Sequence, residues 1–231
     1  SMCGTIKPMT HIIFNKEVFL IVESSLPATL RLATILIEQA SDWTAAYNEE
    51  IRDVLWKKLR YSEDDEVLQE VAWTLGAMAK SHRDVFRDYA FEYQEDLETL
   101  IDESREEDTR RKTTEKAIYA LVCRLSVVTE AERRADPRTY DKFISKLVKE
   151  WLPINEVTEA FETVYSYLAT LIRPGNRAIR RSDRIRRSSI GITSKTSAID
   201  IDENLDRLLL IIGSALSKEG IWVGKEMIGL K

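Results

Sequence analysis

The sequence predicts an all-α protein in which antiparallel helix pairs stack into a solenoid. Only 8 glycines and 5 prolines interrupt the 231 residues, which is too few for the many turns of a sheet protein. Apolar residues make up 44% of the chain and charged residues 32%, as expected for helices with one packed face and one wet face. Helical patterns also recur in pairs at a spacing of about 40 residues, the period of helical-repeat arrays.

The individual helices follow from stretches in which apolar residues recur at helical spacing. Pro27 and Pro137 suit the first turn of a helix, where the missing N–H has no partner to lose. Four residues are candidate N-terminal caps, because a short side-chain oxygen can accept from the free amides of the first turn: Asp42, Ser62, Asp108 and Asp136. The predicted helices cover residues 10–23, 27–39, 43–60, 65–81, 84–105, 109–126, 137–151, 156–173 and 202–218, with a short one after Gly220.

The segment Ser145 to Arg173 carries the most information. It is predicted to form one amphipathic helix, a corner at Trp151-Leu152-Pro153 and a second amphipathic helix. Proline cannot donate a backbone hydrogen bond and disfavours the helical region for the residue before it, so Leu152 should end the first helix.

This corner, followed by an acidic stretch and the pattern YxxLxxLI from Tyr165, resembles the C-terminal HEAT repeats of importin-β (karyopherin-β) nuclear transport receptors. Glu66–Ser81 (EVLQEVAWTLGAMAKS) is similar to the repeated first helix of those receptors, and Glu115–Val127 has a similar layout. The resemblance runs from about Glu66 to the C-terminus. It implies a HEAT/armadillo-like superhelix, with residues 1–231 as a single HEAT-repeat segment.

The resemblance also implies a function. The full receptors bind protein cargo with basic segments, bind phenylalanine-glycine repeats of pore proteins, and release cargo when Ran-GTP binds, mainly at repeats outside this segment. The protein would then work in the cytoplasm and the nucleus. Ser1-Met2 resembles the scar of a removed tag, and we expect the chain to be a C-terminal fragment of a longer receptor.

The helix predicted for residues 84–105 has an acidic face. In the transport receptors the second helix of each repeat lines the concave surface and receives basic cargo. The resemblance therefore makes Glu92, Glu95 and Asp96 candidate cargo contacts. The alternative is an ordinary solvated face, which most charged helix surfaces are.

A strongly basic segment, the loop 174–199, breaks the helical pattern. From Arg173 to Ile199, seven arginines and one lysine oppose Asp183, which gives +7 and leaves −12 on the rest of the chain. Its composition favours disorder in the free protein. A solvated linker competes with three specific roles, namely a phosphate or RNA contact, a localisation-like peptide and, first among them, a ligand for the acidic faces of the same chain. The residues concerned are Arg177, Arg180, Arg181, Arg184, Arg186 and Arg187, followed by Ser188 and Ser189 as a possible kinase site.

Large aromatic residues recur on apolar helix faces and are expected in the core rather than in a ligand cage. Cys123, among apolar neighbours, is expected to be a small core residue rather than a nucleophile. Trp222 is expected to cover the last repeat. The predicted core aromatics are Trp56, Trp73, Tyr119, Trp151 and Tyr165.

Enzymatic motifs are missing from the sequence. It has no GxGxxG, GxxxxGK[ST], HExxH, GxSxG or CxxC, and its only histidines are His11 and His82, so neither a cofactor nor a metal site is predicted. No apolar run approaches the ~20 residues that cross a bilayer, and no secretory signal is present, so we expect a soluble intracellular protein without a membrane partner.

The sequence therefore favours a binding protein, with a nuclear transport receptor as the first hypothesis. A HEAT or armadillo scaffold or adaptor without a transport role is the main alternative. RNA binding through the basic loop is disfavoured, because that loop has almost no aromatic residues to stack on bases and the remaining chain is acidic. An enzyme is the least favoured class.

Overall fold

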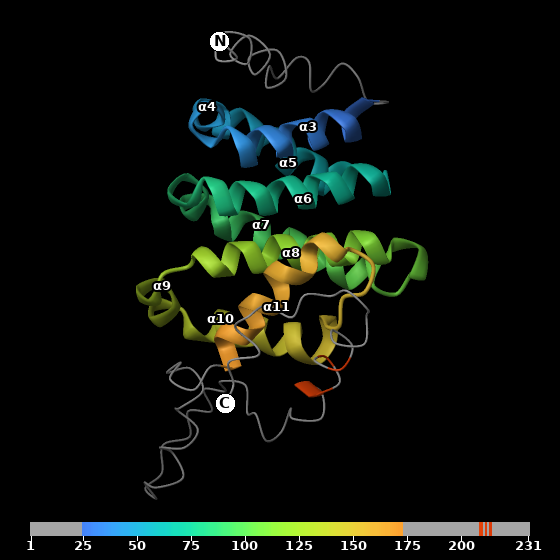
Figure 1. Ribbon diagram of the computed structural model, residues 1–231, viewed down its shortest axis with the longest axis vertical. Coiled ribbons are helices and arrows are strands. Elements are labelled where there is room, and N and C mark those ends of the chain that lie inside the picture. Colours follow the sequence, from blue (N-terminus) through green and yellow to red (C-terminus); the bar gives the residue numbers. More distant parts are fainter. Residues whose placement is uncertain (1–24, 173–207, 210, 212, 214–231) are drawn as a thin grey trace, which may run out of the picture. The chain divides into compact units, whose positions relative to one another are not determined.

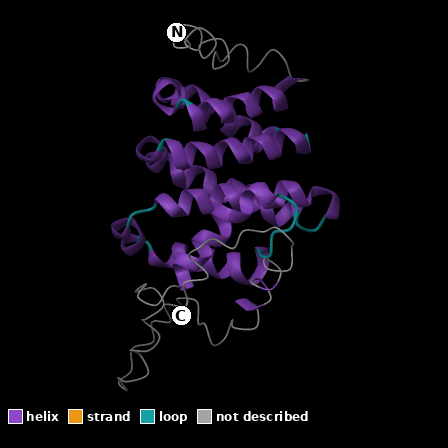
Figure 2. Cartoon of the chain, in the orientation of Figure 1, coloured by secondary structure: helices purple, strands orange, loops and turns teal. Residues whose placement is uncertain are grey.

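The computed structural model describes residues 25–172 and positions 208, 209, 211 and 213, without the side chains of residues 84–92, Glu130 and Ile172. The chain divides into two compact units, Ser1–Val127 and Val128–Lys231. Every regular element within the described residues is helical, which confirms the predicted all-α class (Figure 2). The predicted helix at residues 10–23 lies outside the described residues, as does most of the one at 202–218.

Three helices of unit 1 stack on one another in sequence order: α3 packs on α6, and α6 packs on α8 (Figure 1). Between them in the chain come α5, which contacts α6 and α7, and α7, which packs on α8. The elements are α3 (Leu26–Gln39), α4 (Ser41–Thr44), the 3-10 turn η2 (Ala45–Tyr47), α5 (Asn48–Tyr61), α6 (Asp65–Ser81), α7 (Arg83–Ser104), the 3-10 turn η3 (Asp108–Arg110) and α8 (Arg111–Val127).

The middle helix, α6, is the most enclosed element of unit 1. Eleven of its 17 residues are buried, because it is covered by α3 on one side and α8 on the other. Small residues let α8 approach closely: Gly76 lies directly against the ring of Tyr119, which in turn stacks on Trp73 with ring centroids 4.1 Å apart. Gly76, within the segment Glu66–Ser81, thus allows a close contact between α6 and α8.

Several side-chain hydrogen bonds between the helices of unit 1 join residues 35 to 48 positions apart. The hydroxyls of Thr34 and Thr74 lie 2.8 Å apart, and Trp56 donates to Asp96 at 3.1 Å; both pairs are separated by 40 positions. The first pair joins α3 to α6 and the second joins α5 to α7. The spacing predicted from hydrophobic patterns therefore also appears in the hydrogen bonds between helices.

Unit 2 contains the predicted helix, corner and second helix. Helix α10 (Pro137–Lys146) continues into a π-helical turn, η4 (Leu147–Trp151), after which Leu152 is extended, as predicted for the residue before Pro153. Helix α11 (Thr158–Ile172) follows. Phe143 and Trp151 meet edge to face with centroids 5.2 Å apart. A short helix, α9 (Glu130–Ala135), precedes α10; it was not predicted, although Thr129 and Glu132 form a capping box at its start.

The observed first residues of the helices show which of the predicted N-terminal caps were right. Asp136 caps α10 by accepting from the amide of Thr139, and Pro27 and Pro137 lie in first turns, as predicted. Three other predictions were wrong. Asp42 lies inside α4, Ser62 instead accepts from the amide of Asp64, which is the true cap of α6, and Asp108 begins the turn η3 rather than capping α8. In each case the helix does not start at the residue that follows the predicted cap, although α6 itself begins at Asp65 as predicted.

The predicted helix from Trp43 to Arg60 is interrupted at its start. It comprises α4, the 3-10 turn η2 and α5. Thr44, which ends α4, is fully buried and its hydroxyl lies 3.0 Å from Nε2 of His82. This pairing gives the buried imidazole of His82, which is 7% exposed, a polar partner.

The stability of the protein should fall as the pH drops through the titration range of His82. Burial lowers the pKa of His82 below its usual 6.5, only partly opposed by the charge of Asp42. Below pH 6.5 the unfolded chain therefore binds a proton that the folded chain resists, so stability is fully present above about pH 7 and is lost on acidification. Between pH 7.5 and 5.5 we expect His82 to contribute a loss of at most about 1.4 kcal/mol, the limit set by its unfolded pKa.

Urea unfolding of the chain and of His82→Gln at both pH values measures this effect. The wild type should lose more stability on acidification than the variant, because the carboxylates are common to both. His11→Gln is the control and should keep the wild-type pH dependence. Equal losses in the wild type and in His82→Gln would show that His82 does not titrate differently in the folded state.

Candidate functional site

The three acidic residues predicted as cargo contacts belong to α7. Its exposed carboxylates begin with Glu95, whose side chain points to solvent. Asp96 is different, because its side chain is only 20% exposed and is engaged by α5. The side chain of Glu92 lies outside the described residues. Of the predicted set, Glu95 is exposed and has no ion pair among the described residues, and Asp96 is part of an interhelical cluster.

This cluster comprises Trp56 and Arg60 from α5 and Asp96 from α7. Asp96 Oδ2 accepts from Trp56 Nε1 at 3.1 Å and from Arg60 Nε at 2.8 Å. The guanidinium of Arg60 also lies over the indole of Trp56, 4.4 Å from the ring centroid. One cation is thus held by an aromatic face and a carboxylate at the same time.

The prediction that Trp56 belongs to the core was wrong. Its ring is only partly covered, and its N–H reaches the carboxylate of a neighbouring helix. The same holds in part for Trp73, which is partly exposed although stacked on Tyr119, whereas Tyr119, Trp151 and Tyr165 are buried as predicted. Two signals in the sequence could have identified the cluster: Trp56 and Arg60 are four residues apart, on one helix face, and Asp96 follows Trp56 by one repeat length.

The rest of this part of α7 is fixed to α8. Gln94, 8% exposed, donates to Glu98 at 2.8 Å and accepts a hydrogen bond from Arg124, which is 3% exposed. Because a buried guanidinium needs a partner, this link ties the register of α7 to that of α8. The acidic surface of α7 is therefore presented on a rigidly packed helix rather than on a loop.

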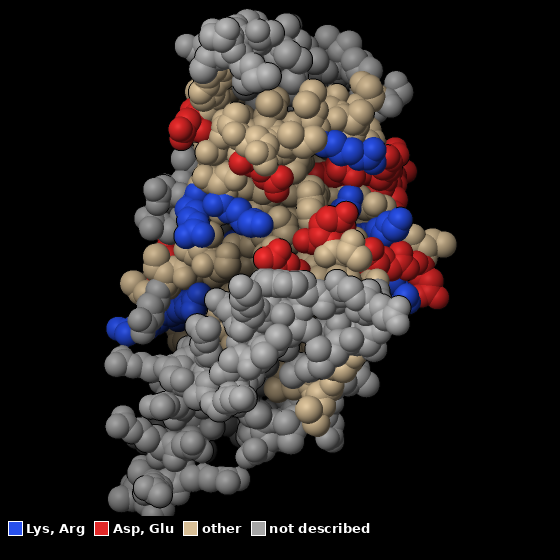
Figure 3. Space-filling view, in the orientation of Figure 1, with Lys and Arg blue, Asp and Glu red and all other residues tan. Residues whose placement is uncertain are grey.

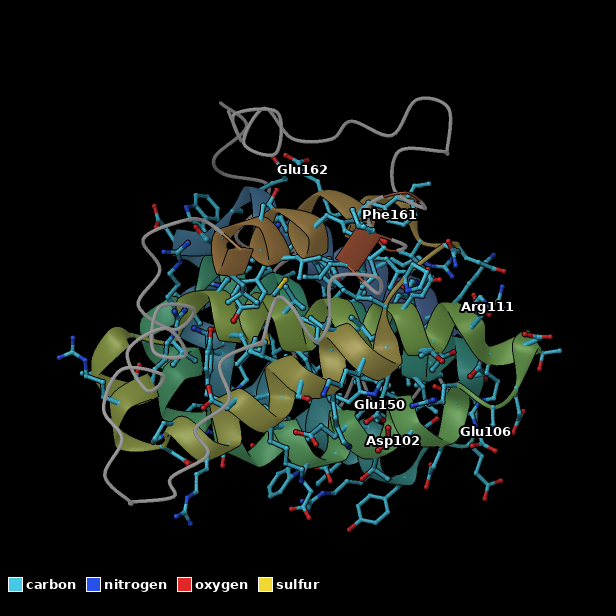
Figure 4. All side chains as sticks on the ribbon, turned by 90° about the horizontal axis from the view of Figure 1, so that it is seen from below. Asp102, Glu106, Arg111, Glu150, Phe161 and Glu162 are labelled. Carbon is cyan, nitrogen blue, oxygen red and sulfur yellow. The ribbon has the colours of Figure 1, made fainter. Side chains whose placement is uncertain are left out.

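A second concentration of acid, here called the acidic end, lies where α6 begins, α7 ends and α8 begins. Figure 3 shows it as red side chains on the right of the view, with a few cations between them. Arg110 pairs with Asp65 at 3.0 Å, and Arg111 with Asp108 at 2.8 Å. Figure 4 shows Asp102, Glu106 and Arg111 at this end. Its acidic residues are Glu63, Asp64, Asp65, Glu66, Asp102, Glu103, Glu106, Glu107 and Asp108.

The two units differ in charge. Unit 1 has 16 basic and 24 acidic residues, a net charge of −8, and unit 2 has 18 basic and 15 acidic residues, a net charge of +3. The predicted basic loop belongs to unit 2, and Arg177 through Arg187, Ser188, Ser189 and Trp222 all lie outside the described residues. The acidic charge that a basic ligand would meet is therefore concentrated in unit 1.

The described residues offer little to covalent or metal chemistry. Cys123 is fully buried in α8, and burial raises the pKa of its thiol to about 12, so it is a core residue, as predicted. Within the part of the chain that the structure describes, no three histidine, cysteine or acidic side chains are grouped to hold a metal ion. No helix in the same part is both long and apolar enough to span a bilayer.

Comparison with known proteins adds no relative to this description. No protein-family model matches the sequence, and neither the curated proteins nor the solved structures give a significant match. The site therefore has to be judged from its own geometry.

Proposed function

We propose that this chain is a HEAT-type solenoid segment of an importin-β-like nuclear transport receptor, and that it works by binding protein. The observation that carries the proposal is the pairing of helices at an offset near one repeat length, 40 positions for Thr34 with Thr74 and for Trp56 with Asp96, and 46 positions for Glu70 with Lys116. Such an offset is expected when each helix pair is one repeat of an array that buries its apolar face against its neighbours. The proline corner at Leu152 and the pattern from Tyr165 add the likeness to the transport receptors.

The proposed ligand is a basic segment of a cargo protein. The charge of −8 on unit 1 would attract it, and the exposed carboxylates of α7 together with the acidic end would receive it. Small rotations between stacked helix pairs would let the array adjust to the ligand. The basic loop, at an effective concentration in the millimolar range, would act as a tethered competitor for the same surface.

Binding of two peptides tests this function. One is a basic localisation-signal peptide and the other a phenylalanine-glycine repeat peptide, each titrated in near-physiological salt into the whole chain and into a variant lacking residues 177–187. We expect both peptides to bind, and we expect the deletion to strengthen binding of the basic peptide because it removes the competitor. Binding of the phenylalanine-glycine peptide should not change.

The outcomes separate the hypotheses. Unchanged affinity of the basic peptide after the deletion would contradict the tethered competitor. Binding of the basic peptide without any binding of the phenylalanine-glycine peptide would favour a helical-repeat scaffold or adaptor over a transport receptor. Binding of neither peptide would contradict the proposed function of this segment.

A further inference from the structure

The cluster of Trp56, Arg60 and Asp96 has the form of a cation site that is already filled. An indole face and a carboxylate converge on one guanidinium, with 4.4 Å from the Arg60 Cζ atom to the ring centroid and 2.8 Å from Arg60 Nε to Asp96 Oδ2. Trp56 N–H donates to the same carboxylate at 3.1 Å and so fixes the ring beside it. If the side chain of Arg60 is removed, the aromatic face of Trp56 and the charge of Asp96 remain in place for another cation.

The side chain of Arg60, which occupies this site, is easy to displace. The side chain of Arg60 is 42% exposed, whereas that of Asp96 is 20% exposed, so the receptor half of the cluster is more enclosed than the occupant. Arg60 is also near the C-terminal end of α5, which ends at Tyr61. An exposed ion pair of this kind contributes little net stability, because the side chain gives up rotational freedom to make it.

We propose that Trp56 and Asp96 form a subsite for an arginine side chain of a protein partner, and that Arg60 is a built-in stand-in which the incoming arginine displaces. This subsite rests on the proposed function, since it assigns one contact of the basic ligand. It also explains why Asp96 is engaged within the chain although it belongs to the acidic face of α7. The pairing of Arg60 with Asp96 inside the molecule competes with the pairing of Asp96 with the arginine of the partner.

The chemistry favours arginine over lysine as the ligand. A planar guanidinium can stack on the indole and donate to a carboxylate from its edge, while a lysine ammonium is a compact and strongly hydrated point charge. With Arg60 displaced, a guanidinium could use both oxygens of Asp96, because Trp56 needs only one acceptor position on Oδ2. Peptides that differ only in arginine and lysine should therefore bind with different affinities.

The chain contains a matched comparison for Arg60. Arg31 of α3 also reaches the next helix of the stack, where its Nη2 lies 2.6 Å from Glu66 Oε1 and its Nε 3.2 Å from Glu70 Oε1, and its side chain is similarly exposed at 53%. Among the described residues, no aromatic ring accompanies Arg31 in this pairing. Replacing either arginine by alanine changes the charge of unit 1 equally, but only the Arg60 replacement opens the proposed subsite.

The experiment measures the affinity of the whole chain for a blocked tetra-arginine peptide by calorimetry, with tetra-lysine and tetra-citrulline peptides of the same length as comparisons. The variants are Arg60→Ala, Arg31→Ala, Asp96→Asn and Trp56→Phe, each checked for an unchanged helical spectrum. We expect Arg60→Ala to bind tetra-arginine about threefold to tenfold more tightly, because the site no longer has to be vacated. Arg31→Ala should change the affinity by less than twofold, and Asp96→Asn should weaken it.

A second readout locates the contact. The indole N–H resonance of Trp56, assigned from the spectrum of Trp56→Phe, should shift on addition of tetra-arginine in the Arg60→Ala variant more than the other four tryptophan signals. Unchanged or weaker binding by Arg60→Ala, or an equal gain in Arg31→Ala, would overturn the subsite while leaving a basic ligand elsewhere on unit 1. No binding of tetra-arginine by any form of the chain would overturn both the subsite and the proposed binding of basic segments.

Discussion

Gly76→Ala should destabilise unit 1 by about 2 kcal/mol, although alanine is the better helix former. A Cβ atom at position 76 would overlap Cε1 of Tyr119 and lie 2.8 Å from its Cδ1. The ring cannot easily retreat, because it is 2% exposed and stacked on Trp73. Overpacking typically costs about 1–3 kcal/mol, and the overlap of the added Cβ atom with a ring that cannot retreat puts the cost at about 3 kcal/mol. About 1 kcal/mol is recovered from helix propensity, which leaves a net loss of about 2 kcal/mol.

Thermal unfolding measures this cost, with an expected fall of about 5 °C in the unfolding temperature. Gly213→Ala is the matched control, because a Cβ atom there meets nothing within 4 Å and the substitution should be neutral or slightly stabilising. A double-mutant cycle with Tyr119→Leu assigns the cause, since the smaller side chain should relieve most of the penalty of Gly76→Ala. A stabilising Gly76→Ala would mean that α6 and α8 lie further apart than the structure places them.

Much of the helical framework could be predicted because it follows local rules. The apolar period placed most helices within a few residues, and Leu152 ended its helix because a proline follows it. The short helix α9 escaped prediction because six residues carry too little periodicity, although its capping box was present. The interruption between α4 and α5 could not be predicted from the local sequence, because it coincides with the buried contact of Thr44 with His82, 38 positions away.

The candidate site was harder to predict because it depends on which residues of α5 and α7 meet. The acidic character of α7 was visible in the sequence, but charge alone did not distinguish the exposed Glu95 from the engaged Asp96. Trp56 was assigned to the core because it lies on a predicted apolar helix face, while its polar contact is a carboxylate 40 positions away. A search for polar and aromatic pairs at the repeat offset would have found it.

Glu70→Ala should be the most destabilising single change among the ion pairs of the described residues, at about 3 kcal/mol. Glu70 belongs to α6 and is 4% exposed; its Oε1 accepts from Lys116 of α8 at 2.8 Å and lies 3.2 Å from Arg31 Nε of α3. The carboxylate of Glu70 thus joins the three stacked helices α3, α6 and α8. Its removal leaves Lys116, only 17% exposed, as a poorly compensated charge next to the apolar core.

Comparison with Glu66 shows why the burial of the carboxylate determines how much stability its removal costs. Glu66 also pairs with Arg31, at the shorter distance of 2.6 Å, but its side chain is 58% exposed and water replaces much of what the pair provides. Urea unfolding should therefore give a loss below about 1 kcal/mol for Glu66→Ala, and added salt should reduce it further, whereas the loss from Glu70→Ala should be nearly independent of salt.

A paired replacement separates the charge that is left behind from the contact that is lost. The double variant Glu70→Met with Lys116→Met removes both buried charges and keeps side-chain volume, so it should recover most of the stability lost in Glu70→Ala. If the double variant is no more stable than Glu70→Ala, the unpaired lysine is not the cause. The link from Glu70 to Arg31 would then be what holds α3 on α6, and Arg31→Ala should cost as much as Glu70→Ala.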